Sequence, residues 1–185
     1  MRKLFVAPAA ALLLASCVTQ RSTEVKPAGN PTVPNGPVAF KDTNLEAVVR
    51  AALKKPQGVI TRKEIASLET LKANNAGISD LTGLEYATNL TNLALYNNKV
   101  TTLGPLATLT KLTNLSLLDN QITDLVPLAK LPKLKWLALN DNRVTDVAPL
   151  AGLSSLAKLY LGNNKISTIA PLADLTKLTR LYLHQ

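Results

Sequence analysis

The sequence has few of the side chains that carry most enzyme chemistry. It contains one cysteine, Cys17, one histidine, His184, and only 4% aromatic residues. A lone cysteine cannot form an internal disulfide, and these counts provide no His–Cys cluster for zinc. We also find no paired carboxylates, Gly-rich phosphate loop or nucleophile–base pair. We therefore expect no catalytic residues, no metal and no cofactor, which means that the protein is not an enzyme.

Negative charge is also scarce. Lysine and arginine number 21 against 12 aspartates and glutamates, which gives a formal net charge of +9. A basic chain can contact nucleic acid, anionic lipid or acidic glycopolymer, but scattered cations are also typical of a solvated surface. The cations here are scattered, and the export signal described next argues against nucleic acid. We predict no nucleic-acid partner.

The N-terminus resembles a secretion signal. Residues 1–17 are MRKLFVAPAAALLLASC, in which Arg2 and Lys3 precede an apolar run. The run has about twelve residues, the length of a signal-peptide core and too short for a membrane-spanning helix. Its end, LASC, resembles the bacterial lipobox. The resemblance implies a signal peptide over 1–16 and diacylglycerol on Cys17. The position of Cys17 argues against an ordinary signal with a chance cysteine and against an uncleaved amphipathic segment.

A lipidated cysteine implies a place in the bacterial cell envelope, held to the membrane by the lipid anchor. Each buried CH₂ of an acyl chain adds about 0.8 kcal/mol of membrane affinity, so several chains hold a protein firmly. If the cell has two membranes, Val18 after the cysteine is similar to the pattern of lipoproteins sent to the outer membrane.

Residues 17–37 carry the lipidated cysteine and a flexible tether. Four prolines alternate there with Gly, Asn, Thr and Ser, without apolar periodicity. The tether either lifts a folded domain off the membrane or is simple slack.

Residues 38–67 are predicted to form a helical N-terminal cap. Asp42 or Thr43 can cap a helix whose apolar residues then recur at helical spacing. Thr61 and Glu64 have the spacing of a capping box and indicate a second helix. Such a cap covers a first coil that would otherwise expose its core.

Residues 68–185 align without a gap in rows of 22, five full and one partial. Leucines open each row and recur in an L-x-L segment, whose period of two predicts a short strand with inward leucines. Proline precedes the last leucine of most rows and suits the first turn of a helical return segment. A column of asparagines is suited to bonding the buried backbone of the turn: Asn98, Asn120, Asn142 and Asn164.

The pattern L-x-x-L-x-L-x-x-N-x-I is that of leucine-rich repeats. It predicts an α/β fold: a right-handed solenoid with a curved parallel sheet, short helical or 3₁₀ return segments and the N-terminal helical cap.

Two segments resemble the internalin-type branch of bacterial leucine-rich repeats. They are NNKISTIAPLADLTKLTRLYL in the array and FKDTNLEAVVRAAL with ITRKEIASL in the cap, and the resemblance covers about residues 40–185. It implies a curved solenoid that binds other proteins. The array is short, has a lipobox in place of a cell-wall sorting signal and lacks a C-terminal cap, so only the binding module is carried over.

A partner would meet the strand positions between the inward leucines. The Trp and three of the four Tyr lie there, with cations nearby, and such residues are enriched in binding hot spots. We expect Tyr160 and Tyr182 to be cross-strand neighbours and Trp136 to lie beside Lys158 for a cation–π contact. Alternatively, the aromatics only stabilise the sheet. The candidate binding face comprises Tyr96, Leu118, Trp136, Lys158, Tyr160, Arg180, Tyr182 and His184.

The sequence stops at Gln185, directly after the last predicted strand. Either the reading frame is truncated, or the uncapped strand pairs end to end with a second copy.

Two functions fit these patterns. The first is a surface-anchored lipoprotein whose repeats bind another protein or peptide. The alternative is a structural envelope lipoprotein that holds anionic glycopolymer or lipid on its basic surface. Salt discriminates them, because screening weakens the second steeply.

The lipid anchor can be tested directly. Radiolabelled palmitate should enter the wild-type protein in the bacterium and should not enter Cys17→Ala, because the acylated sulfur is missing. Equal labelling of both proteins, or labelling of neither, would show that Cys17 is not the acylation site.

Overall fold

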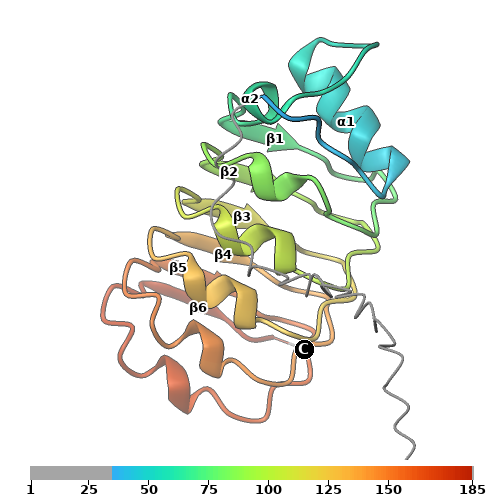
Figure 1. The fold of residues 1–185 in the computed structure, drawn as a ribbon. Helices are drawn as coiled ribbons and strands as arrows, with labels where there is room; N and C mark the ends of the chain where they lie inside the picture. The colour runs from blue at the N-terminus through green and yellow to red at the C-terminus, as the bar shows by residue number, and fades with distance from the viewer. Residues whose placement is uncertain (1–34, 185) are drawn as a thin grey trace, which may run out of the picture. The chain divides into compact units, whose positions relative to one another are not determined.

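The computed structural model describes residues 35–184, and the predicted signal peptide, Cys17 and most of the predicted tether lie outside these residues. Two α-helices precede six strands that alternate with 3₁₀ turns (Figure 1). The helices are α1 (Thr43–Leu53) and α2 (Arg62–Ile65). The strands are β1 (Thr70–Lys72), β2 (Asn92–Ala94), β3 (Asn114–Ser116), β4 (Trp136–Ala138), β5 (Lys158–Tyr160) and β6 (Arg180–Tyr182).

The six strands form one parallel sheet in chain order, β1 to β6. Each residue pairs with the residue one repeat further on; for example, Leu71 pairs with Leu93. Figure 1 shows the coils stacked from the helical end to β6, with the strands in one layer and the 3₁₀ turns in another. The predicted leucine-rich-repeat solenoid with its parallel sheet and short return segments is confirmed.

The core between these layers is aliphatic. The central leucine of each strand from β1 to β5 is buried, and so is the leucine of each 3₁₀ turn. All buried hydrophobic residues of the described chain are Leu, Ile, Val or Ala. Because the same side chains recur every coil, each coil buries its apolar surface only against its neighbours, as a repeat architecture requires.

The return segments are short 3₁₀ helices, and four of the five carry a proline in their first turn. They are η1 (Leu84–Tyr86), η2 (Gly104–Thr108), η3 (Val126–Lys130), η4 (Ala148–Leu150) and η5 (Ala170–Leu172). Proline occupies the first or second position of η2 to η5. Before η3 and η4, an aspartate side chain accepts a hydrogen bond from the backbone two residues later, at 2.8 Å in both cases. These aspartates therefore cap turns.

Each strand from β1 to β5 is followed by a turn that contains an Asn or Asp in the left-handed region. Asn75, Asn97, Asp119, Asp141 and Asn163 have φ between 51° and 56°. Asn and Asp tolerate this region better than other side chains that carry a Cβ. The turn reverses the chain away from the sheet at the same place in every repeat.

The asparagine column ties each coil to the coil before it. In Asn120, Oδ1 accepts from the N–H of Val100 at 3.0 Å. Its Nδ2 donates to the carbonyls of Leu95 at 2.9 Å and Leu117 at 3.1 Å. Val100 and Leu95 belong to the preceding repeat and Leu117 to its own. One side chain therefore satisfies buried backbone groups of two coils.

The other members of the column make the same contacts. Asn98, Asn142 and Asn164 each accept from a backbone N–H twenty residues earlier and donate to carbonyls of their own and the preceding coil. Asn98, Asn120 and Asn142 are buried. The ladder begins only at Asn98, because Ala76 occupies the corresponding position in the first coil.

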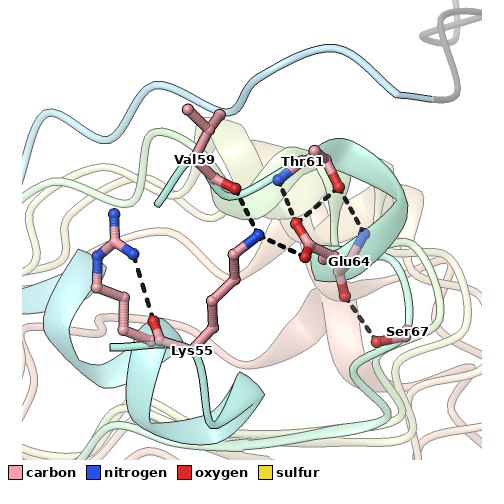
Figure 2. Close-up of polar contacts among 6 residues, drawn as sticks. Lys55, Val59, Thr61, Glu64 and Ser67 are labelled. Carbon is pink, nitrogen blue, oxygen red and sulfur yellow. Dashed lines mark hydrogen bonds and ion pairs between the residues drawn. The ribbon is translucent and has the colours of Figure 1, made fainter. Parts of the chain in front are cut away.

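The cap packs its two helices against the first coil. Leu45 and Val49 of α1 and Ile65 of α2 are fully buried in the core. The capping box at Thr61 and Glu64 is formed in both directions (Figure 2). Lys55 Nζ lies 2.6 Å from Glu64 Oε1, and this contact is the main reason that the pKa of Glu64 falls to about 2.

The cap begins slightly earlier in the chain than the sequence suggests. Pro37 forms an antiparallel bridge with Thr61, and the N–H of Arg62 donates to Gly36 O at 2.9 Å. The absence of apolar periodicity among the prolines places Gly36 and Pro37 in the predicted tether. The backbone on either side of Thr61 bonds to this segment, and only the folded cap brings the two segments together.

Asp42 joins the cap to the first repeat. Its Oδ1 caps α1 by accepting from the N–H groups of Asn44 at 2.9 Å and Leu45 at 3.1 Å. Its Oδ2 accepts from the N–H of Ser79 at 2.7 Å, from the Ser79 hydroxyl at 3.0 Å and from the N–H of Asp80 at 3.3 Å. Burial alone would raise the pKa of Asp42, but these hydrogen bonds outweigh it and hold the pKa below its usual value.

We expect Asp42→Ala to lower the free energy of unfolding by about 2–3 kcal/mol, because it removes an N-cap and charge-assisted bonds to the next coil. Asp146→Ala is the control, since its exposed side chain caps a single turn. Chemical denaturation measures both. The pKa of Asp42 is lowered in the folded state, so the difference from wild type is full above the unfolded pKa, near 3.9, and shrinks as pH falls through the folded pKa. A constant difference across this range would contradict the assignment.

We expect Asn120→Ala to lower the free energy of unfolding by about 3–5 kcal/mol, because it leaves a buried N–H and two buried carbonyls without partners. Asn114→Ala, on the exposed face of β3, should change stability by only about 0.5 kcal/mol. Urea unfolding followed by circular dichroism compares the two. Similar losses of stability in both variants would contradict the conclusion that the buried asparagine column stabilises the fold more than a surface asparagine does.

Candidate functional site

The outward positions of the six strands form the candidate surface, which we call the strand face. It has three columns of residues, which are exposed or partly exposed apart from the buried Ala138 and Gly162. They are the first strand residue (Thr70, Asn92, Asn114, Trp136, Lys158, Arg180), the third strand residue (Lys72, Ala94, Ser116, Ala138, Tyr160, Tyr182) and the residue two positions further on (Asn74, Tyr96, Leu118, Asn140, Gly162, His184).

Three aromatic rings meet on strands β4 to β6. Tyr160 and Tyr182 pair in register, and their rings stack with centroids 4.7 Å apart and planes 5° apart. Trp136 leans on Tyr160 with centroids 5.9 Å apart and planes at 56°. Tyr182 is 42% exposed, and the other two rings are half-buried. The sheet therefore holds the rings in one orientation before any partner arrives.

Two cations of the strand face, Lys158 and Arg180, lie on the same strands as this aromatic cluster. Lys158 pairs in register with Trp136 on one side and Arg180 on the other. The expected cation–π contact between Lys158 and Trp136 does not form in the described chain. The Trp136 ring packs against Tyr160 instead. The observed contact of that kind is Arg62 over the ring of Tyr86, at 4.4 Å, away from the strand face.

A shallow hollow lies over strands β1 to β3. Its floor includes Leu71, Leu93 and Ala94, and its side facing the aromatic cluster is Trp136. The small side chains of Ala94 and Ser116 leave the space, because larger side chains stand in the same column at either end. The strand face is thus hollow at its N-terminal half and filled by aromatic rings at its C-terminal half.

Asparagines give the hollow a polar edge. Asn114 Nδ2 donates to Asn92 Oδ1 at 2.6 Å, and Asn92 Nδ2 donates to the hydroxyl of Thr91 at 2.9 Å. These side chains form a second chain of hydrogen bonds across neighbouring coils, here on the surface. Amides of this kind can bind the backbone of a visiting peptide.

The structure spreads the eight residues of the predicted binding face over five strands and their ends. Trp136, Lys158, Tyr160, Arg180 and Tyr182 form one cluster. Tyr96, 39% exposed, and the half-buried Leu118 follow β2 and β3 in the neighbouring column, and His184 follows β6. In that column a Cβ on Gly162 would lie 2.5 Å from the His184 carbonyl, so glycine is required where these two backbones approach.

Sequence reasoning missed two contacts. Asp42 was recognised only as a possible helix cap, because its bonds to Ser79 and Asp80 span more than thirty residues. The Arg62–Tyr86 contact joins α2 to η1 and has no local signal. Both attach the cap to the array, where the repeat pattern gives no guidance.

Within residues 35–184, no group of three or more His, Cys, Asp or Glu side chains gathers that could hold a metal ion. In the same residues no helix is both long and apolar enough to cross a membrane.

Comparisons with known proteins agree with this geometry. A family model described as leucine-rich repeats in two copies matches residues 88–130, 110–152 and 132–174. A search of curated proteins finds no significant match. Among solved structures, an internalin of Listeria monocytogenes, InlF, is 35% identical with a TM-score of 0.77, and the match covers 82% of this chain and 46% of that one.

Two further structures are similar. The functional domain of InlJ from Listeria monocytogenes, which includes a cysteine ladder, is 30% identical with a TM-score of 0.63, over 77% of this chain and 36% of that one. A leucine-rich-repeat protein of Leptospira interrogans is 30% identical with a TM-score of 0.58, over 64% and 32%. The chain thus spans less than half the length of each of these relatives. The stacked coils, their register and these matches show a leucine-rich-repeat solenoid that is similar to those of the internalins.

Proposed function

We propose that the protein is a non-catalytic, lipid-anchored protein of the bacterial cell envelope whose strand face binds another protein or a peptide. The observation that carries the proposal is the cluster of Trp136, Tyr160 and Tyr182. These rings lie on the strand face, where Tyr182 is exposed and the other two are partly exposed, and not among the buried core residues, all of which are aliphatic in the described chain. Trp and Tyr are the residues most enriched in the centres of protein interfaces.

The rings are also prepared for binding. Stacking across parallel strands fixes their orientation, so that little side-chain entropy is lost when a partner docks. A role in sheet stability alone would be satisfied by the stack of Tyr160 on Tyr182. It does not account for the hollow beside Trp136, which leaves one side of the cluster open.

The size of the strand face limits the partner. Six strands about 4.8 Å apart give a width of roughly 24 Å, and strands this short give a height of roughly 12 Å. The resulting area, about 300 Å², is less than the roughly 800 Å² per partner of a standard interface. A peptide segment or a protruding loop therefore suits this face best.

The anchor is proposed from the lipobox-like sequence that ends at Cys17. Its position before the repeats would keep the strand face at the envelope. The palmitate experiment on Cys17→Ala tests this part independently of binding.

Cross-linking and pull-down from intact cells test the binding role. Wild type should capture a specific protein, and the triple variant Trp136→Ala, Tyr160→Ala, Tyr182→Ala should capture at least tenfold less. Each lost anchor costs about 1–2 kcal/mol or more at an interface hot spot. Circular dichroism must show that the variant is folded. Tyr182→Ala alone, which removes an exposed ring, provides a milder test.

Tyr86→Ala is the matched control, because it removes an aromatic ring away from the strand face. Capture that is unchanged by the triple variant would assign the rings to sheet stability. Capture that instead disappears steeply with added salt in wild type and triple variant alike would favour anionic glycopolymer or lipid on the basic surface.

A further inference from the structure

The strand face carries charge of one sign only. Its three columns contain the cations Lys72, Lys158 and Arg180 and no aspartate or glutamate. The acidic residues that follow the third column, Asp119 and Asp141, lie in the turns beyond it. All 11 aspartates and glutamates of residues 35–184 lie outside the three columns, so this segregation sets the electrostatic character of the face.

Two of the cations stand side by side. Lys158 and Arg180 are register partners on β5 and β6. Like charges directly opposite each other on neighbouring strands repel. The ion pairs among residues 35–184 are Arg50–Glu46 and Lys55–Glu64, both in the cap, so no described carboxylate relieves this repulsion. An anion placed between the two side chains would do so.

The cation pair of Lys158 and Arg180 lies near two other features of the strand face, the aromatic cluster and the hollow. Lys158 is half-buried and lies in register between Trp136 and Arg180, so it stands at the border of the aromatic cluster. At the other side of Trp136, the hollow floored by Leu93 and Ala94 fits an apolar side chain. An apolar hollow and a cation pair that can bind an anion therefore lie on the same face, with Trp136 between them.

We propose that the strand face binds an extended acidic peptide segment, with an apolar residue in the hollow and a carboxylate between Lys158 and Arg180. This rests on the proposed function and names the chemistry of the partner. The hollow lies over β1 to β3 and the cation pair over β5 and β6, and their centres are about 17 Å apart at the usual strand spacing. An extended chain covers that distance in four or five residues.

The polar edge of the hollow favours a peptide over an anionic glycopolymer. The stack of Tyr160 on Tyr182, with centroids 4.7 Å apart, covers one face of each ring, and Trp136 leans on Tyr160, which reduces the ring surface left for stacking a sugar. The amides of Asn92 and Asn114 beside the hollow are suited to peptide backbone.

The test uses the full chain, immobilised, and a phage library of random dodecapeptides. Selected peptides should carry Asp or Glu four or five positions from a large apolar residue. In fluorescence anisotropy with a resynthesised peptide, replacing that acidic residue by its amide should weaken binding at least tenfold. The double variant Lys158→Met, Arg180→Met should weaken binding equally, and the two changes together should add little.

The matched control is Lys130→Met, Lys165→Met, which removes the same charge from exposed positions outside the strand face. It should change affinity by less than twofold. Equal losses in both double variants would indicate only general charge attraction and would overturn the proposal.

The outcomes also separate this proposal from the proposed function. If the selected peptides show no acidic preference and bind Lys158→Met, Arg180→Met normally, but lose affinity for Trp136→Ala, the strand face binds peptides and the acidic specificity is wrong. If no selected peptide depends on Trp136 or on the cation pair, or none is selected, both proposals fail for peptide ligands.

Discussion

The fold depends on one repeated hydrogen-bonding side chain. Parallel strands of three residues leave most of each coil's backbone outside the sheet, and part of that backbone is buried. The asparagine column satisfies buried groups there, because an amide both accepts and donates and reaches its own coil and the preceding one at once. This geometry fixes where each coil lies on the last. It also explains why the repeat length does not vary: an inserted residue would carry the amide out of reach.

Because the ladder and the aliphatic core hold every coil in the same way, the strand face is free to vary. Only three outward positions per coil are available, and neighbouring coils place them side by side. A change from Ala or Ser to Tyr in one column is therefore enough to turn a hollow into a stacked aromatic surface. The binding properties of the face arise from the order of the columns rather than from any single repeat.

The first coil shows what replaces the ladder where it cannot extend. Ala76 stands at the asparagine position, and the element before it is a helix instead of a coil. Asp42 connects the two: one carboxylate oxygen caps α1 and the other accepts from the first repeat. A carboxylate suits this junction because all its partners are donors, whereas within the array both donors and acceptors must be met.

The sequence by itself determined the solenoid, the register of its strands and the column in which each side chain lies. Strict periodicity does this, since every repeat must bury the same residues against the next. It thereby placed Trp136, Tyr160 and Tyr182 on one face and paired Tyr160 with Tyr182. Only the tertiary structure decided how those side chains orient: Trp136 turns to Tyr160 rather than to Lys158, and the hollow forms beside it. It also decided the junction of Asp42 with Ser79 and of Pro37 with Thr61. These contacts join segments outside the repeat, where no periodicity relates one residue to its partner.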